Sequence, residues 1–455
     1  MIQARNLTKR IVALTAGAGA LAAAVLTVAP TAPHASAASS TVPAAPTSGQ
    51  CEQLYGLPCY QPDQIRDAYN LPALYQKQIT GTGTTIVIVA PFGSPTIGND
   101  LAEFDRQFGY PEPPSFQIIA PVGKIPAYDE NNPEMIGAAG ETSMDVEYAH
   151  ALAPGANILL VETPVAETEG TTGFPEIVAA EKYVIDHGLG DVISQSFGAS
   201  EETFTNRQQL EPLRAAYQDA YAHHVTVLAS SGDTGAANVD ANGNLATSPV
   251  TSWPGSDPLV TGVGGTKLEL NGGKFTSVAW NDTNDQAVNE HFAGNAGPNP
   301  AASGGGKSEF FARPRYQDGA RTVVGARRGV PDISMSAAAS EPVLVYTTFG
   351  GLPPGWQLGT GTSEGTPEFA AIVALADQVA GHRLGLVNPT LYALAARHAP
   401  GIVDVTSGDN TVSFRQGAAG QLVTVKGYPA TKAYDLVTGV GTVDAPSLVH
   451  ELAGR

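Results

Sequence analysis

Between residues 84 and 229, short apolar runs alternate with segments of helical periodicity. The predicted strands lie at 84–89, 156–161, 191–194 and 225–229, and the predicted helices between them lie at 100–105, 175–187 and 205–222. Strands that are apolar on both faces and are joined by helices indicate a parallel sheet with helices on both faces. We therefore predict an α/β fold, in which ligand sites lie at the carboxyl ends of the strands.

A run of glycines and small residues at 359–367 leads directly into a helix-forming, apolar run at 368–376. This pattern places Ser363 near the N-terminus of a buried helix. Free N–H groups and the helix dipole favour a serine nucleophile there, because they stabilise the oxyanion that forms when it attacks a carbonyl. Two alternatives stay open. In the first alternative, Ser363 serves only as a helix cap. In the second, the glycines hold a phosphate, although their spacing matches no phosphate loop.

Two acidic residues share one face of a further predicted helix at 140–150. Glu141 and Asp145 are four residues apart, which separates their Cβ atoms by about 6 Å. In a cleft, one of the two carboxyls would have to stay protonated, and such a proton-sharing pair can act as a general base. The alternative is an ordinary solvated helix face.

Asp233 lies in Ser-Ser-Gly-Asp-Thr-Gly, directly after the predicted strand at 225–229. This is a strand end, where active sites collect. A carboxylic acid that is held neutral there can donate a hydrogen bond to an oxyanion, and this role would tie activity to acidic pH. The alternative is a simple turn residue.

A Ser-His-Asp triad would need a histidine that faces Ser363 from a strand end or a helix start. The strand at 84–89 is followed by Ala-Pro-Phe-Gly, with no aspartate. Four histidines lie in or at the ends of predicted helices, without glycine-rich surroundings: His150, His187, His223 and His224. We therefore expect them to be structural.

Residues 1–37 have the layout of a secretory signal peptide. Basic residues precede a long apolar run, and Ala-Ser-Ala follows, so we expect cleavage after Ala37. An uncleaved membrane anchor is the alternative. Residues 38–59 are predicted to be a linker with a short disulfide loop, because Cys51 and Cys59 are the only two cysteines and should pair in an exported chain.

The 455-residue chain has a formal net charge of −19. Such an acidic balance argues against nucleic acid and anionic membranes as partners. It suits a protein that works in acid, where carboxylates titrate and self-repulsion falls. We expect an exported monomer that has no membrane contact once the signal is removed.

From about residue 60 to its C-terminus the chain resembles the sedolisin family of serine-carboxyl peptidases. The resemblance rests on motifs that occur together in the expected order: Glu141-x-x-x-Asp145 followed by Ala-Pro-Gly-Ala, Ser-Gly-Asp233-Thr-Gly, and Gly-Thr-Ser363-x-x-x-Pro. Softer matches lie at 263–266, 304–308, 330–334 and 388–392. The resemblance implies that residues 60–455 form one peptidase domain with a subtilisin-like parallel sheet. It makes Ser363 the nucleophile, Glu141 the general base, Asp145 its partner and Asp233 the oxyanion donor.

The resemblance also implies one structural calcium ion near the C-terminus. The matching positions are Asp404, Asp435 and the carbonyls of Val405, Thr431 and Ala433. Two carboxylates with several carbonyls suit a hard, oxygen-seeking cation. Thr431 and Ala433 stand where the family usually has glycines. Without the resemblance, the two aspartates read as turn residues.

The chain departs from the family pattern at three places. Glu364 follows Ser363 where the family usually has alanine, and Thr360 replaces a usual serine. An acid at 364 would raise neighbouring pKa values or alter substrate choice. Family members commonly carry a long prosegment, whereas only a short linker separates Ala37 from Cys51. We therefore expect the enzyme to fold without an inhibitory prosegment.

These expectations combine into a secreted, acid-active serine-type endopeptidase that hydrolyses proteins or peptides through an acyl-enzyme on Ser363. Two alternatives stay open. One is a catalytically silent family member that binds peptides or cell-wall material, which Glu364 and the short linker motivate. The other is a neutral Ser-His-Asp hydrolase.

Overall fold

The structure is a computed structural model that describes residues 43–454, except 241, 243, 295–296 and 418–419. The predicted signal peptide and the first part of the predicted linker lie outside the described residues. No helix in the described part of the chain has an apolar stretch long enough to cross a bilayer.

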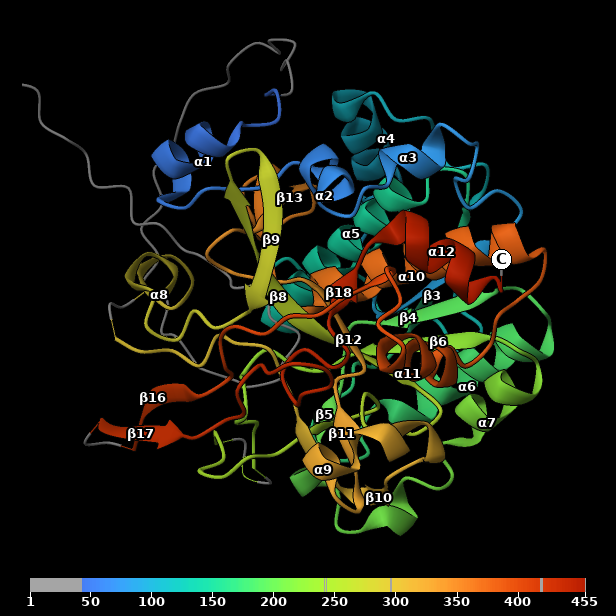
Figure 1. The fold of residues 1–455 in the computed structure, drawn as a ribbon. Coiled ribbons are helices and arrows are strands. Elements are labelled where there is room, and N and C mark those ends of the chain that lie inside the picture. Colours follow the sequence, from blue (N-terminus) through green and yellow to red (C-terminus); the bar gives the residue numbers. More distant parts are fainter. Residues whose placement is uncertain (1–42, 241, 243, 295–296, 418–419, 455) are drawn as a thin grey trace, which may run out of the picture.

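A twisted sheet forms the centre of the molecule (Figure 1). Seven of its strands run parallel, and β9 (Lys274–Ala279) adds to β8 in the antiparallel direction. The order of the parallel strands is β12 (Ile333–Ser336), β8 (Thr261–Asn271), β6 (Thr226–Ser230), β4 (Val192–Gln195), β1 (Thr85–Pro91), β3 (Asn157–Thr163) and β2 (Phe116–Ile119). The predicted α/β fold with a parallel sheet is confirmed.

Helices cover both faces of this sheet, because successive strand side chains point to opposite sides. On β1, Ile86 and Ile88 face one core, whereas Val87 and Val89 face the other. The first core is covered by α4 (Ile97–Phe108), α5 (Pro133–Leu152), α10 (Thr362–Ala380) and α12 (Ala445–Leu452). The second is covered by α6 (Phe174–Asp186) and α7 (Ala215–Ala222).

Three of the predicted helices have different lengths in the structure. The helix expected at 100–105 is the longer α4. The helix expected at 205–222 is only α7, preceded by short 3₁₀ turns at 201–203 and 207–209. Pro212 explains the difference, because it lacks an N–H and disfavours a helical residue before it. The helix expected at 140–150 begins earlier, at Pro133, where the Asn132 side chain accepts hydrogen bonds from two backbone N–H groups.

The described part of the segment 38–59, predicted as a linker with a short disulfide loop, contains a helix that was not predicted. Residues 48–55 form the helix α1 (Ser48–Tyr55), whose first turn is capped by Gln50 and Thr47. The Pro43 carbonyl accepts a hydrogen bond of 3.1 Å from Trp356 Nε1. The predicted disulfide between Cys51 and Cys59 is present and fully buried. This segment therefore packs against the main domain instead of leading loosely to it.

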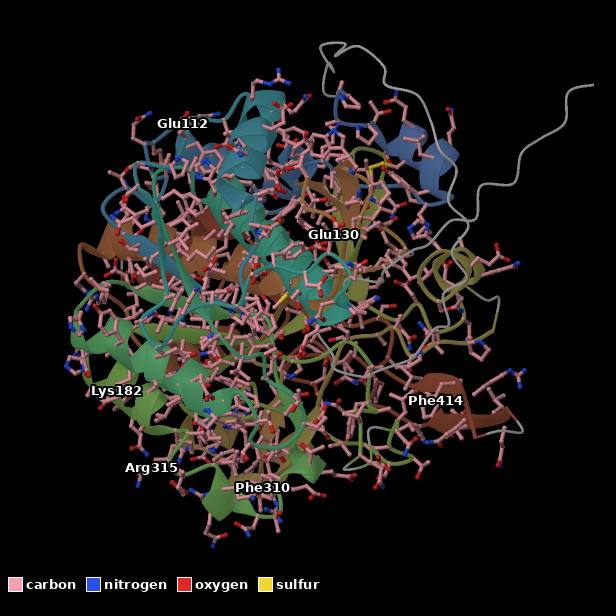
Figure 2. All side chains as sticks on the ribbon, turned by 180° about the vertical axis from the view of Figure 1, so that it is seen from behind. Glu112, Glu130, Lys182, Phe310, Arg315 and Phe414 are labelled. Atoms are coloured by element: carbon pink, nitrogen blue, oxygen red, sulfur yellow. A yellow bond between two sulfur atoms is a disulfide. The ribbon has the colours of Figure 1, made fainter. Side chains whose placement is uncertain are left out.

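The remaining elements form small additions around the central layers. The other helices are α2 (Pro62–Ala68), α3 (Pro72–Tyr75), α8 (Gln286–Phe292), α9 (Arg321–Val324) and α11 (Asn388–Ala396), besides a 3₁₀ helix at Arg315–Ala320. The two-stranded pairs are β5 (Ala199–Ser200) with β7 (Ser252–Trp253), β10 (Gly306–Ala312) with β11 (Arg327–Val330), β13 (Val343–Thr347) with β14 (Gly355–Gly359), β15 (Ile402–Val403) with β18 (Thr442–Val443), and β16 (Val412–Gln416) with β17 (Gln421–Val425). Figure 2 shows the charged side chains of Glu112 and Lys182 at the periphery of this assembly.

Candidate active site

Ser363 lies in the first turn of α10, as the sequence pattern predicts, and is 1% exposed. Gly361 precedes the helix with a φ of 102°, a backbone conformation that favours glycine. A Cβ atom at this position would lie only 2.7 Å from Asp233 Oδ2. Glycine is therefore needed for the loop after β6 to approach the start of the helix.

Asp233 follows β6 and is joined to the residue before Ser363. Its Oδ1 accepts hydrogen bonds from Thr362 N (2.7 Å) and from Thr362 Oγ1 (2.8 Å). Its Oδ2 accepts none from the described residues and faces Gly361. Burial raises the pKa of Asp233 to about 6, although the two bonds from Thr362 act in the opposite direction. Below that pH the side chain is an acid that can donate from Oδ2.

Glu141 and Asp145 lie on α5, which packs against α10. Burial raises the pKa of both carboxyls well above the usual range, and the Asp145 charge raises that of Glu141 further. The Ser363 hydroxyl is near enough to Glu141 to lower its pKa, while Glu141 Oε1 has no hydrogen-bond partner. The pair therefore has an open acceptor beside the serine hydroxyl.

Ser196 joins the two helices at the end of β4, a role that the sequence analysis missed. Its Oγ donates to Asp145 Oδ1 (2.8 Å) and lies 3.2 Å from the Ser363 carbonyl oxygen. In return, Ser363 Oγ donates a long bond of 3.5 Å to the Ser196 carbonyl. A small polar residue directly after a buried strand was the available signal, because neighbouring strand ends meet at one edge of the sheet.

The four predicted site residues thus lie together, although they come from three separate parts of the chain. No salt bridge involving them occurs among the described residues. The charges of Asp233 and Glu167 instead raise the pKa of Glu141 further. Because carboxylates crowd without a compensating cation, some of them hold protons. The site therefore combines a hydroxyl, a proton acceptor and a potential acidic donor.

The described histidines have other partners. His150 is buried, with Nε2 2.8 Å from the Pro111 carbonyl and 3.3 Å from Asp105 Oδ1. His187 and His223 each bond a carbonyl four residues earlier in their own helices. No described histidine forms a hydrogen bond with Ser363, so the geometry of these residues does not provide a Ser-His-Asp triad.

Glu364 and Glu368 form a second carboxyl pair on α10, inside the core. Both are fully buried, and none of their four oxygens accepts a hydrogen bond of normal geometry. Burial raises the pKa of Glu364 to about 8, and burial together with the Glu364 charge raises that of Glu368. The hydroxyls of Ser336 and Tyr69 lie close enough to oppose these shifts. Glu364 is therefore a core residue, and the charge of Asp233 also raises its pKa.

The predicted calcium positions lie on two adjoining loops. Asp404 Oδ2 accepts a hydrogen bond of 2.9 Å from Ala433 N, and Ala433 has a φ of 65°. Asp435 is 2% exposed and accepts hydrogen bonds from Thr431 N and Val437 N, both at 2.9 Å. No group of three or more His, Cys, Asp or Glu side chains that could hold a metal ion occurs among the described residues.

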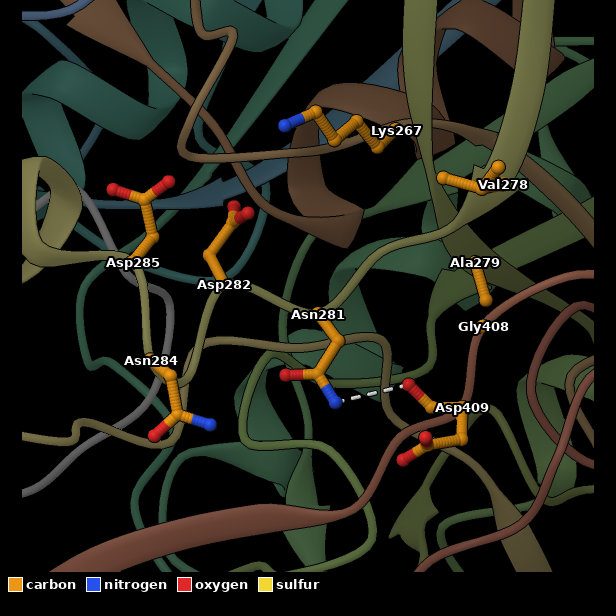
Figure 3. A pocket seen from close by; sticks show the side chains of 9 residues that line it. All are labelled: Lys267, Val278, Ala279, Asn281, Asp282, Asn284, Asp285, Gly408 and Asp409. Atoms are coloured by element: carbon orange, nitrogen blue, oxygen red, sulfur yellow. Dashed lines mark hydrogen bonds between the residues drawn. The ribbon is translucent and has the colours of Figure 1, made fainter.

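A cavity of about 430 Å³ lies between β8, β9, the segment at 281–285 and the loop at 408–409 (Figure 3). The excursion at 279–306 forms part of its wall and also borders the site, because Ala302 N donates to the Asp233 carbonyl. Asp282 bonds Trp280 Nε1 at 2.8 Å, and Asp285 caps α8. None of the four candidate catalytic side chains lines this cavity.

Comparisons with known proteins agree with this fold. The sequence model of the subtilase family matches residues 125–419. Kumamolisin from Bacillus sp. (strain MN-32) is 29% identical over 84% of this chain and 62% of its own length. Tripeptidyl-peptidase 1 from Bos taurus is 31% identical over 86% of this chain and 64% of its own length. The solved structure of Pseudomonas sedolisin, a serine-carboxyl proteinase complexed with pseudo-iodotyrostatin, has a TM-score of 0.70 at 24% identity, covering 88% of this chain and 99% of that one.

The family match covers more than half of the chain and includes all four candidate catalytic residues. The chain therefore belongs to the subtilase family, and within it to the sedolisin family, as the motifs indicated. It spans less than two thirds of the length of the curated relatives that it matches.

The buried pair on α10 predicts that the fold is stabilised by acid. Both carboxyls bind protons more tightly in the folded than in the unfolded chain. The contribution of Glu364 is therefore complete below about pH 4.5 and is lost as the pH rises towards about 8, and Glu368 acts in the same direction. Among the described residues, the titratable groups that face the pair are Tyr60, Tyr69, Tyr148 and Asp233, none of which is cationic. We expect the variant with Glu364→Gln and Glu368→Gln to gain on the order of 3 kcal/mol relative to wild type between pH 5 and pH 8.

Urea denaturation at a series of pH values measures this difference. Glu112→Gln is the matched control, because Glu112 is exposed at the periphery (Figure 2). Parallel pH profiles for the double variant and wild type would show that the buried pair does not set the pH dependence of folding.

Proposed function

We propose that this chain is a serine-type peptidase that works in acid and hydrolyses peptide bonds through an acyl-enzyme on Ser363. The observation that carries the proposal is the meeting of Ser363, Glu141 and Asp233 at one point of the fold. The peptidase names of the relatives and the sedolisin fold support it. The same support extends to protein or peptide substrates.

In the first step, Ser363 Oγ bonds to the substrate carbonyl carbon while its proton moves to Glu141. The long bond from Ser363 to Ser196 holds the hydroxyl weakly, so it can turn towards Glu141 when substrate arrives. Asp145 is held by Ser196 and tunes the proton affinity of Glu141 through its charge. The Glu141 proton then passes to the leaving amine as the C–N bond breaks.

The carbonyl oxygen becomes negative during this attack and needs a hydrogen-bond donor. Asp233 supplies one from Oδ2 only while it is protonated, because its Oδ1 is already used by Thr362. A water molecule then attacks the acyl-enzyme, with Glu141 taking its proton, and releases Ser363. The hydrogen bond from Asp233 to the oxyanion therefore requires acidic pH.

Export is part of the same proposal. A mature peptidase that works in acid fits the predicted signal peptide and the acidic composition. An uncleaved anchor would instead leave the full chain in the membrane fraction.

Ser363→Ala and Glu141→Ala should each lower the kcat/KM for denatured protein at acidic pH by at least about 10⁴-fold, because nucleophile and base act as one unit. Ser196→Ala should cost less, since Ser196 positions Asp145 and does not touch the substrate. A peptide-aldehyde inhibitor should bind wild type and not Ser363→Ala. Full activity in either of the first two variants would remove that residue from the mechanism, and no reaction of wild type with the inhibitor would favour a silent, peptide-binding protein.

Activity should fall about tenfold per pH unit above about pH 6, where Asp233 loses its proton. In Asp233→Asn, the amide can donate at any pH, so this limb of the pH profile should move to higher pH. Asp233→Ala should lose about 10²–10³-fold in kcat at all pH values. Rate profiles of the three proteins test the assignment. An unchanged limb near pH 6 in Asp233→Asn would assign it to another group.

We also propose that the loops around Asp404 and Asp435 hold one calcium ion, together with the carbonyls of Val405, Thr431 and Ala433. The donor set fits: Asp435 is buried without an ion-pair partner among the described residues, so a cation would compensate its charge. The bond from Ala433 N to Asp404 keeps the two loops side by side. Calcium would supply charge compensation and join the loops, and it takes no part in the reaction.

Calcium should raise the thermal midpoint of the Ser363→Ala protein, which cannot digest itself, by about 2–5 °C over the chelated protein. Asp435→Asn in the same background should abolish this response, because it removes a ligand charge. Asp318→Asn is the control at an exposed site. A calcium response that survives in Asp435→Asn would place the ion elsewhere.

A further inference from the structure

A second, smaller cavity lies beside the N-terminal part of α5 and has a volume of about 200 Å³. Its walls are apolar and come from Phe92, Ile125, Tyr128 and Met135, with two exposed prolines at the rim. Two polar side chains, Ser94 and Glu162, complete the lining. The cavity is thus an apolar cup with a small polar area.

Both polar side chains lack partners. Ser94 is 4% exposed, and its Oγ has no hydrogen-bond partner within the described part of the chain. Glu162 is half-buried and forms no hydrogen bond or ion pair with the described residues. Burial raises its pKa to about 7, so at acidic pH the free side chain is mostly a neutral acid, and a cation placed beside it favours its ionised form. An unpaired buried hydroxyl and an uncompensated carboxyl are costly unless a ligand engages them.

The loop after β1 is shaped around the Glu162 carboxylate. Gly93 has a φ of 68°, and a Cβ atom there would lie 1.9 Å from Glu162 Oε1. Its neighbour Phe92 also has a positive φ, of 59°, and its N–H donates to the Thr163 carbonyl. The loop therefore gives up favourable backbone geometry and leaves space for a carboxylate that bonds nothing else.

The cavity is within reach of the candidate active site. Glu162 is paired with Ala90 near the ends of β3 and β1, and β4, which leads to Ser196, is the next strand. Two strand spacings are about 10 Å. Met135 precedes Glu141 by six residues on α5, which is about 9 Å along a helix axis. An extended peptide advances about 3.3 Å per residue, so three residues cover this separation, or two residues together with the reach of a long side chain.

We propose that this cavity is a substrate subsite for a lysine or arginine side chain located two or three residues from the scissile bond. The proposal rests on the proposed peptidase function. The apolar walls fit the methylene stem of such a side chain, and Glu162 and Ser94 can receive its cationic, hydrogen-bond-donating end. Aliphatic or aromatic side chains would pack against the apolar walls of the cavity but leave Glu162 and Ser94 without a hydrogen-bond partner.

A scan of internally quenched peptides tests this assignment. One residue at a time, from four before to three after the scissile bond, is changed to lysine or to norleucine, which has a similar stem without the charge. All peptides are acetylated, so that no free N-terminal ammonium is present. At one position two or three residues from the bond, lysine should give a kcat/KM about tenfold above norleucine.

Glu162→Gln should abolish this preference while leaving the kcat/KM for the norleucine peptide within about twofold. Glu112→Gln is the control and should keep the preference, because Glu112 is exposed at the periphery. Gly93→Ala should reduce the preference in the same way as Glu162→Gln, because its Cβ displaces the carboxylate. Equal rates for both peptides at every position, or a preference that survives in Glu162→Gln, would overturn the proposal.

A binding measurement separates this outcome from failure of the proposed function. Calorimetric titration of Ser363→Ala with the lysine and norleucine peptides does not depend on cleavage. Tighter binding of the lysine peptide, lost on adding Glu162→Gln, would support the subsite even if wild type cleaves nothing. Equal affinities would count against the subsite even if wild type cleaves both peptides.

Discussion

The two hydrogen bonds from Thr362 to Asp233 Oδ1 are the constraint on which the rest of the site depends. One carboxylate oxygen receives both the backbone N–H and the hydroxyl of Thr362, and this joins the loop after β6 to the first turn of α10. The contact uses only Oδ1, so it fixes the direction of Oδ2 without occupying it. It also fixes Ser363, the next residue in the chain. A single interaction thereby sets the position of both the donor and the hydroxyl.

The second constraint is the concentration of buried carboxyls around this contact. Glu141, Asp145 and Asp233 have no cation beside them among the described residues, and burial raises the pKa of each. Paired with arginine or lysine, they would be ionised and could not donate from an acid group. The lack of cations therefore has a chemical use, because it keeps protons available where an oxyanion would form. The same burial destabilises the fold at higher pH, because these carboxyls must then ionise without the stabilisation that water gives a charge.

Much of the fold and of the candidate site was predictable from the sequence, and the missing parts have physical reasons. The apolar runs at 84–89 and 225–229 correctly predicted β1 and β6, because a parallel strand buried on both faces appears in the sequence as an uninterrupted run of apolar residues. The strands after residue 260 were not predicted, since glycine-rich or mixed sequences such as β8 take their structure from their neighbours. Glu141 and Asp145 were found from their spacing on one helix. Ser196 was not, because its role exists only where β4 ends beside α5 and α10.

The two carboxyl pairs show why position matters more than composition. Both pairs have a spacing of four residues, Glu141 with Asp145 on α5 and Glu364 with Glu368 on α10. Burial raises the pKa of all four carboxyls. The first pair borders the hydroxyl of Ser363, so its proton can move during a reaction. The second lies in the core near Tyr69, Tyr148 and Ser336, so its protons act mainly on the stability of the fold, although the Asp233 charge also raises the pKa of Glu364. Because α10 carries both Ser363 and this second pair, the conditions that keep the donor protonated are also those that keep this helix in place.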